Sequence, residues 1–420
     1  MPVNVVSMLF FFGIVVFLGY LGHLLFKRTR IPDSLILIIV GLLAGPIFGI
    51  LDSNTISVFK NLTPLLATLT LITLLFEGGL NLNFYYFLQN LTKSSGFTLL
   101  VFLLTVAVST GFFIFLGWTP IIALMISGMV AGTTSAVMAI INETRARKDT
   151  KILLTLEAII TDAFSAVVVL TAIELFLAKS VDVSQIFQSI LGSFSIAAVI
   201  ALVLGIFWLH VLQKWVLKGY EFIMTFGVSL LLFAFVEFSK GSGAIAALVF
   251  GLVLGNGKEI SHMFKMKSKD IDGDFKIFQA ELSFFIRSFF FINLGIIFDL
   301  KLLTFDLALI TLALLGLMFF VRIIGSKILV HFVKEYKQDE FLLQVLTSKG
   351  MAAAALATYP LSIGLPIGEF GSKIVSIISL LIIFSNIFTF IGIFLYERKK
   401  QKQIDGKNNN HRMYKLIKRK

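Results

Sequence analysis

Long runs of apolar residues, separated by short polar and charged loops, set the pattern of the whole chain. Many runs exceed the roughly 18 residues that cross the hydrocarbon of a bilayer. They are apolar on every side, unlike the one-sided stripe of a helix that covers a soluble core. The pattern predicts thirteen spans, at about 5–26, 34–51, 61–83, 96–117, 119–142, 152–178, 186–213, 220–238, 242–256, 277–298, 302–333, 341–364 and 371–396. We therefore expect an all-α, multi-pass membrane protein.

The loops alternate in charge along this series of spans. Most loop lysines and arginines follow the odd-numbered spans, for example at 27–30, 145–151 and 258–276. The loops after even-numbered spans hold single lysines, namely Lys60, Lys179, Lys240, Lys301 and Lys373. Because basic loops stay on the cytoplasmic side, the N-terminus is expected outside the cell membrane and the C-terminus inside.

Composition narrows the class of protein further. The chain is 57% hydrophobic and 14% charged, against about 25% charged for an ordinary soluble domain. Its net charge of +12 is explained by the basic cytoplasmic loops, so no nucleic-acid partner is expected. It contains no cysteine, which excludes disulfides, thiolate nucleophiles and Cys-based metal sites.

No sequence motif indicates an enzyme or a cofactor. The chain has no His-Glu-x-x-His, no Gly-x-Ser-x-Gly and no Gly-x-Gly-x-x-Gly segment, and such motifs mark metallohydrolases, serine hydrolases and nucleotide-binding domains. We expect one membrane domain at 1–396. The basic tail at 397–420 is expected to be cytoplasmic and disordered.

Two spans in matching positions of the two halves are interrupted by small and polar residues. Span 5 carries Gly132-Thr133-Thr134-Ser135, and span 12 carries Ser348-Lys349-Gly350-Met351-Ala352. Matched interruptions are typical of transporters built from inverted repeats, with broken helices crossing near the bilayer midplane. Spans 1–6 and 8–13 would form the repeats. Alternatively, the glycines serve close helix packing, as expected for Gly41-x-x-x-Gly45 and Gly251-x-x-x-Gly255.

Asp162 lies in the middle of an apolar run from Ile152 to Leu177. A carboxylate at that depth is costly, so it usually faces the bundle interior and has a function. It can hold either a proton or a desolvated monovalent cation, and competition between the two is sufficient for antiport. The alternative is an ion pair that only locks two helices together.

Hydroxyl groups near Asp162 could replace the water shell of an alkali cation, together with carbonyls freed at the break. The candidates are Thr161, Thr133, Thr134 and Ser135. Each hydroxyl could instead bond to its own helix.

Glu157 lies five residues before Asp162, about 500° around the helix and so about 140° away from it. It needs a different cationic partner, and the candidates are Arg287, Arg322 and Lys349. Glu77, which ends span 3, either guards the cytoplasmic approach to Asp162 or lies at the membrane interface.

Five short motifs occur in an order that resembles a known family. They are Phe76-Glu77-Gly78-Gly79-Leu80, Glu157-x-x-x-Thr161-Asp162-Ala163, Phe289-Phe290-Phe291-Ile292-Asn293-Leu294-Gly295, Val321-Arg322 and Lys349-Gly350-Met351-Ala352-Ala353. Together they look like the sodium/proton exchanger branch of the monovalent cation–proton antiporters.

The resemblance implies specific roles for these residues. Asp162 would bind sodium (or lithium) and protons in turn, and Glu157 would pair with Arg322 as a structural ion pair. It also implies a homodimer in which each protomer has a dimerisation part and a mobile core part that moves like an elevator. A potassium/proton antiporter or a channel-like potassium efflux protein of the same fold is the alternative.

The chain departs from the family pattern around the site. Thr161 stands in place of the usual Asn, Thr133-Thr134-Ser135 in place of Thr-Asp-Pro, Lys349 in place of Arg, and Ala158 in place of Ser. A single Asp where the electrogenic branch has two predicts one cation exchanged per proton.

Overall fold

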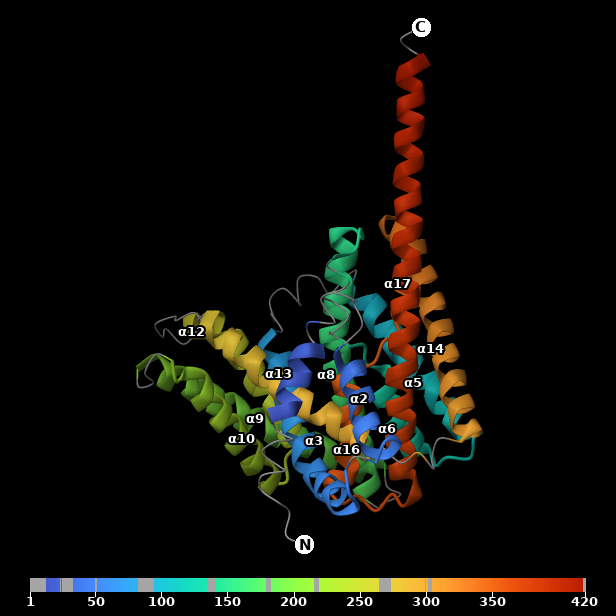
Figure 1. The fold of residues 1–420 in the computed structure, drawn as a ribbon. Coiled ribbons are helices and arrows are strands. Elements are labelled where there is room, and N and C mark those ends of the chain that lie inside the picture. Colours follow the sequence, from blue (N-terminus) through green and yellow to red (C-terminus); the bar gives the residue numbers. More distant parts are fainter. Residues whose placement is uncertain are drawn as a thin grey trace.

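The structure is a computed structural model in which every regular element of the described residues is a helix (Figure 1). It describes residues 13–22, 24, 33–49, 51–81, 94–134, 141, 143–178, 183–214, 219–263, 273–298, 300 and 304–417. The helices of the first half are α2 (Asp33–Leu42), η1 (Leu43–Ile47), α3 (Ser53–Asn81), α5 (Ser94–Phe115), α6 (Pro120–Ala131), α8 (Lys148–Ala178) and α9 (Val183–Lys214). Those of the second half are α10 (Glu221–Phe238), α11 (Gly243–Gly255), α12 (Gly257–Met263), α13 (Gly273–Ile296), α14 (Phe305–Phe332), η4 (Lys334–Asp339), α15 (Glu340–Val345), α16 (Met351–Ser362) and α17 (Glu369–Ile417).

Within the described ranges, eight helices are long and apolar enough to cross a membrane. Four further apolar helices are shorter, at Gly13–Gly22, Leu35–Ile47, Pro120–Ala131 and Gly243–Gly255. Every predicted span contains at least one described helix. Two of these four helices are short for a local reason. Pro46 lies in the π-helical turn that follows α2, and the helical conformation of α6 stops at Gly132.

Glycines allow two pairs of helices to pack with their backbones in contact. A Cβ atom on Gly79 of α3 or on Gly251 of α11 would collide with the backbone of the other helix, and the same holds for Gly41 of α2 and Gly295 of α13. Small residues allow this close approach where lipid gives no hydrophobic driving force. The packing role expected for Gly41 and Gly251 is confirmed.

The buried apolar residues form two clusters. The larger one runs through α3, α6, α8, α11, α13, α16 and α17, and the smaller one joins parts of α5, α8, α14, α15 and α17. α6 packs between α5 and α8, and α14 packs against both α5 and α17. In Figure 1, α9, α10 and α13 lie on one side of α8. The helices α5, α14 and α17 lie on its other side.

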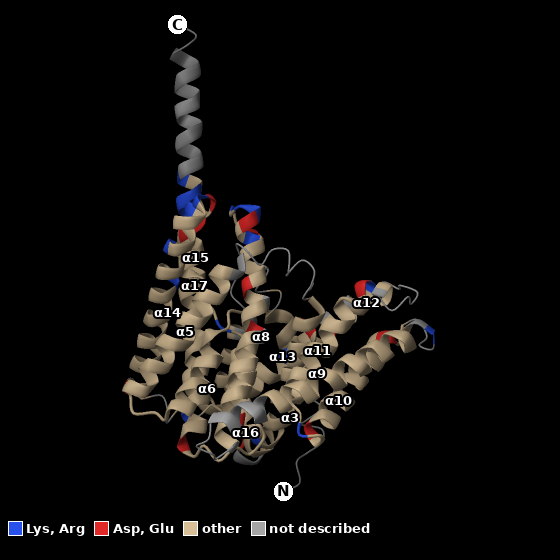
Figure 2. Cartoon of the chain, turned by 180° about the vertical axis from the view of Figure 1, so that it is seen from behind, with Lys and Arg blue, Asp and Glu red and all other residues tan. Residues whose placement is uncertain are grey.

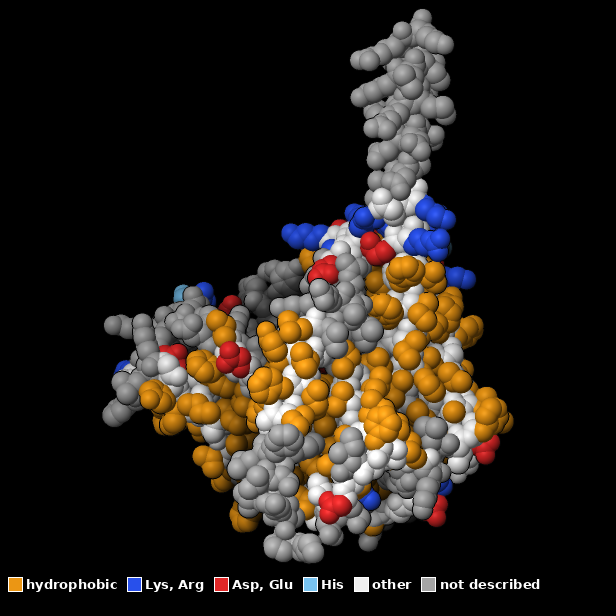
Figure 3. All heavy atoms as spheres, viewed as in Figure 1, with side chains coloured by type: hydrophobic (Ala, Val, Ile, Leu, Met, Phe, Trp, Pro, Cys, Tyr) orange, Lys and Arg blue, Asp and Glu red, His pale blue; other side chains and the backbone are white. Residues whose placement is uncertain are grey.

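The outer faces of the bundle are strongly apolar. Val203 on α9, Leu231 on α10 and Phe320 on α14 are more than half exposed. Figure 3 shows apolar side chains over much of the coloured part of this face, with lysines and arginines gathered where α17 leaves the bundle. Figure 2 shows the same basic end from behind, with the start of α8 beside it. Such an extended exposed apolar surface fits a lipid environment.

The C-terminal segment differs from the sequence-based expectation. Residues 397–417 continue α17 as one helix that projects from the bundle, whereas a disordered tail was expected at 397–420. The lysines and glutamines at 399–403 are good helix formers, and the chain has no proline after Pro366 that would end α17.

Candidate functional site

The two interrupted helices meet where their helical structure stops. α6 ends at Ala131, and Gly132 continues in an extended conformation. α15 ends at Val345, and the chain is non-helical until α16 begins at Met351. The backbone N–H of Thr134 donates to the carbonyl of Ser348 at 3.2 Å. The two breaks are therefore joined directly, backbone to backbone.

Helix α8 is continuous and places Asp162 beside the break of α6. Thr161 accepts a hydrogen bond on Oγ1 from the backbone N–H of Thr133 at 3.1 Å, and its own hydroxyl is 3.4 Å from the carbonyl of Ala158. Thr161 thus ties α8 to the unwound segment. Asp162 itself is half-buried and lies against Gly132.

Lys349 brings a positive charge to the same point from the second break. Its side chain is buried, and its ammonium group donates to the carbonyl of Gly132. The ammonium also acts electrostatically on Asp162. Of the three cations proposed from the sequence, Lys349 is the one that faces Asp162.

Two polar residues of α17 hold Lys349 in place, and sequence reasoning missed both. Ser385 Oγ accepts from the backbone N–H of Lys349 at 3.1 Å, and Asn386 Nδ2 donates to the carbonyl of Lys349 at 2.9 Å. These contacts satisfy backbone groups that the break leaves without helical partners. The signal available was a Ser-Asn pair inside an otherwise apolar span.

Glu157 faces away from Asp162 and binds Arg322 of α14. The guanidinium donates two parallel hydrogen bonds, from Nη1 to Oε1 at 2.6 Å and from Nη2 to Oε2 at 3.2 Å. Arg322 Nε also donates to the carbonyl of Leu343 at 2.8 Å. Both side chains are buried, so this bidentate pair joins α8, α14 and α15 inside the bundle.

Glu77 and Arg287 form a separate group between α3 and α13. Glu77 Oε2 accepts from Ser283 Oγ at 3.0 Å and lies within electrostatic reach of Arg287. Its charge also acts on Asp162. Arg287 therefore serves Glu77 and not Glu157. Ser135 lies outside the described residues.

A second polar cluster lies at the basic end of the bundle, and the sequence did not indicate it. Buried Asp339 accepts hydrogen bonds from Tyr396 at 2.6 Å, from Thr150 at 2.8 Å and from the N–H of Arg147 at 2.9 Å. Lys400 Nζ is 2.8 Å from the same carboxylate. Burial raises the pKa of Asp339, but the bonds from Lys400, Tyr396, Arg147 and Thr150 together hold that pKa below its usual value.

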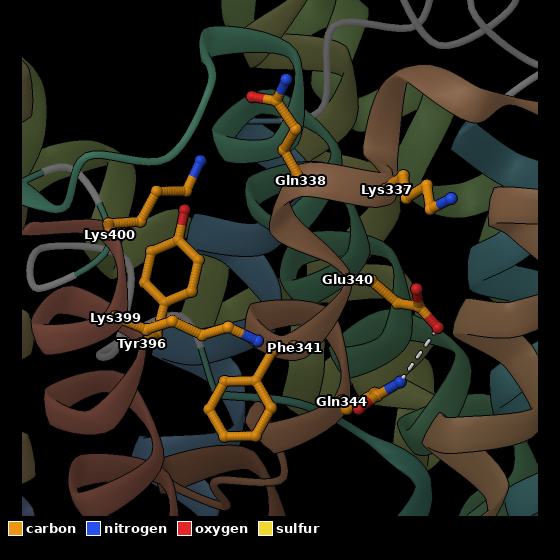
Figure 4. A pocket seen from close by; sticks show the side chains of 8 residues that line it. All are labelled: Lys337, Gln338, Glu340, Phe341, Gln344, Tyr396, Lys399 and Lys400. Atoms are coloured by element: carbon orange, nitrogen blue, oxygen red, sulfur yellow. Dashed lines mark hydrogen bonds between the residues drawn. The ribbon is translucent and has the colours of Figure 1, made fainter. Parts of the chain in front are cut away.

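Beside this cluster lies a polar pocket of about 350 Å³ between η4, α15 and α17. Figure 4 shows Lys400 and Tyr396 of α17 pointing in the same direction, with Glu340 and Gln344 hydrogen-bonded to each other across from them. The pocket shares no residue with the group around Asp162.

These observations define a class of protein. The chain is a helical membrane protein in which two broken helices meet beside a half-buried carboxylate, the arrangement found in secondary transporters. The family model for the sodium/hydrogen exchanger transmembrane domain matches residues 13–395. The chain belongs to this sodium/hydrogen exchanger family.

Individual relatives agree with that membership. The chain is 28% identical over 317 residues to a protein named a probable Na+/H+ antiporter 2 of Methanocaldococcus jannaschii, covering 69% of this chain and 71% of that protein. The structure of the sodium proton antiporter MjNhaP1 from the same organism at pH 8 superposes with a TM-score of 0.76 at 20% identity, over 92% of this chain and 100% of that one. An electron-microscopy structure of that antiporter gives a TM-score of 0.71 at 19% identity, over 94% and 98% of the two chains.

Proposed function

We propose that this protein is a secondary active antiporter that exchanges sodium, or lithium, for protons across the cell membrane. Membership of the sodium/hydrogen exchanger family supports this over the potassium alternatives. The observation that carries the proposal is the position of Asp162, half-buried on a continuous helix beside the break at Gly132.

The chemistry at Asp162 is competition between two ligands. When the carboxylate is charged, a desolvated cation can bind it, with backbone oxygens of the breaks and the hydroxyls of Thr133 and Thr134 as candidates to replace water. When the carboxylate is protonated, the cation is released. Lys349 acts electrostatically on Asp162 and is the candidate counter-charge for the carboxylate when no cation is bound.

Thr161 has a positioning role in this scheme. Its Oγ1 is already engaged with the N–H of Thr133 and the carbonyl of Ala158. Glu157 and Arg322 act away from the cation, because they brace α8 against α14. Glu77, which lies near Arg287, acts electrostatically on Asp162 and adds negative charge along the approach to it.

An elevator-like mechanism follows from this proposal. α5, α6, α8, α14, α15, α16 and α17 form the mobile core part, and the remaining described helices form the dimerisation part of a homodimer. A mass of one chain in detergent would contradict the dimer. Spans 1–6 and 8–13 form two inverted repeats, with the N-terminus outside and the C-terminus inside. A Lys402→Cys variant should react with an impermeant reagent only from the cytoplasmic side.

The central test is Asp162→Asn in proteoliposomes loaded with a pH-sensitive dye. Without an ionisable group, neither ligand can be exchanged, and sodium-driven proton movement should vanish. Asp306→Asn is a matched control, since that residue is an aspartate in the first turn of α14, away from the breaks, and its exchange should equal that of the wild type. Retained exchange in Asp162→Asn would move the site elsewhere.

The same vesicles measure selectivity and stoichiometry. Sodium and lithium should drive proton movement at lower concentrations than potassium. Because one carboxylate carries either one cation or one proton, exchange should be electroneutral. A rate that changes when the membrane potential is clamped at different values would exclude one-for-one exchange.

A further inference from the structure

The backbone of Gly132 packs so closely against α8 that a side chain there would collide with it. A Cβ atom placed there would lie 2.7 Å from Ser165 Oγ and 3.2 Å from Asp162 Oδ1. The hydroxyl and the carboxylate oxygen therefore both lie beside the backbone of Gly132, within about 6 Å of each other. Residues three apart on a helix lie on the same side, which is why Ser165 shares the face of Asp162.

The hydroxyl of Ser165 has no hydrogen-bond partner among the described residues, although it is buried. Serines in apolar helices commonly donate to a carbonyl one turn earlier, as Ser127 does to Ala123 at 2.7 Å. A buried polar atom without a partner is uncommon and calls for an explanation. A ligand held between Ser165 and Asp162 would supply it.

Ser165 is better placed to bind such a ligand than Thr161. A hydroxyl has one proton and two lone pairs. Thr161 uses its proton on Ala158 and one lone pair on Thr133. Ser165 has both lone pairs available.

We propose that Ser165 contributes its Oγ as a ligand to the cation held by Asp162. This inference rests on the proposed function and extends it by naming a residue that determines affinity for the cation. Hard monovalent cations prefer oxygen ligands, and a cation here would have one from Asp162 and one from Ser165. Two charged groups act electrostatically on Asp162, namely Lys349 and Glu77. The ammonium of Lys349 also contacts the carbonyl of Gly132.

The test is Ser165→Ala in proteoliposomes, with proton movement measured over a titration of sodium and of lithium. Loss of one oxygen contact should raise the apparent KM for both ions roughly three- to tenfold. The maximal rate should stay near that of the wild type, because proton binding at Asp162 is untouched. A purely structural role would lower the maximal rate and leave the KM alone.

Ser127→Ala is the matched control, because that buried hydroxyl is satisfied by its own helix; its KM should not change. If Ser165→Ala fails to fold, Ser165→Cys decides, because a thiol of similar size is a poor ligand for a hard cation. A wild-type KM in the folded variant overturns the role of Ser165. If Asp162→Asn is inactive at the same time, the proposed antiport still stands.

Discussion

Glu157 and Arg322 are almost fully enclosed, with side-chain exposures of 1% and 4%. Removing one partner of such a pair leaves an isolated charge in a region of low dielectric constant. The pair also has good bidentate geometry and a third contact to the carbonyl of Leu343. At the scale of single residues, this ion pair is the part of the site whose loss should affect folding more than transport.

Glu157→Ala should lower the free energy of unfolding by about 3–5 kcal/mol, seen as a lower thermal unfolding midpoint in detergent. The double variant Glu157→Leu/Arg322→Met should recover most of that loss, because neither charge remains buried. Glu369→Ala is the control, since its pair with Lys373 is exposed and should contribute at most about 0.5 kcal/mol. Equal losses of unfolding free energy in Glu157→Ala and Glu369→Ala would contradict this interpretation.

Asp339 acts at the scale of elements, because its partners come from different helices. Thr150 lies in the first turn of α8 and Arg147 directly precedes this helix, whereas Tyr396 and Lys400 belong to α17. The Asp339 carboxylate therefore joins the start of α8, which carries Asp162, to α17, whose Ser385 and Asn386 contact the backbone of Lys349. The cluster is a structural joint of the proposed core part.

Asp339→Asn should destabilise the protein near neutral pH by about 2 kcal/mol, the range for hydrogen bonds to a charged group. Because the folded pKa of Asp339 is lowered, its stabilisation is present above the unfolded pKa and is lost as pH falls through the folded pKa. The difference in unfolding midpoint between wild type and Asp339→Asn should thus shrink below about pH 4. A constant difference down to pH 3 would contradict the assignment.

At the scale of the whole molecule, the proposed elevator requires α8 to move relative to α9. Ser193 Oγ of α9 lies 3.5 Å from Glu174 Oε1 of α8, across that boundary. The chain contains no native cysteine, so a pair placed at these two positions can be cross-linked without background reaction.

The variant Glu174→Cys/Ser193→Cys, treated with a short cleavable thiol cross-linker, should lose most sodium–proton exchange in proteoliposomes. Cleaving the linker should restore it, because only the relative movement is blocked. Each single-cysteine variant treated in the same way should keep its activity. Full exchange in cross-linked protein would exclude movement at this boundary.

The sequence by itself determined the features that depend on local pattern. Hydrophobic run lengths predicted a helix in every span, and the small residues at Gly132 and Gly350 indicated where α6 ends and where the chain between α15 and α16 is non-helical. Helical phase separated Glu157 from Asp162, and the family motifs led to Arg322. The assignment of Asp162 as the ion-binding residue stays a prediction.

Only the tertiary structure decided which polar groups meet. Ser385 and Asn386 reach Lys349 across more than 35 residues, and Asp339 collects donors from as far away as Arg147. Thr161 proved to be engaged with Thr133, and Ser165 alone kept a free buried hydroxyl beside Asp162 among the described residues of α8. The physical reason is that apolar burial depends on the period of residues along one helix, whereas a hydrogen bond depends on the position of a partner that the fold brings from elsewhere in the chain.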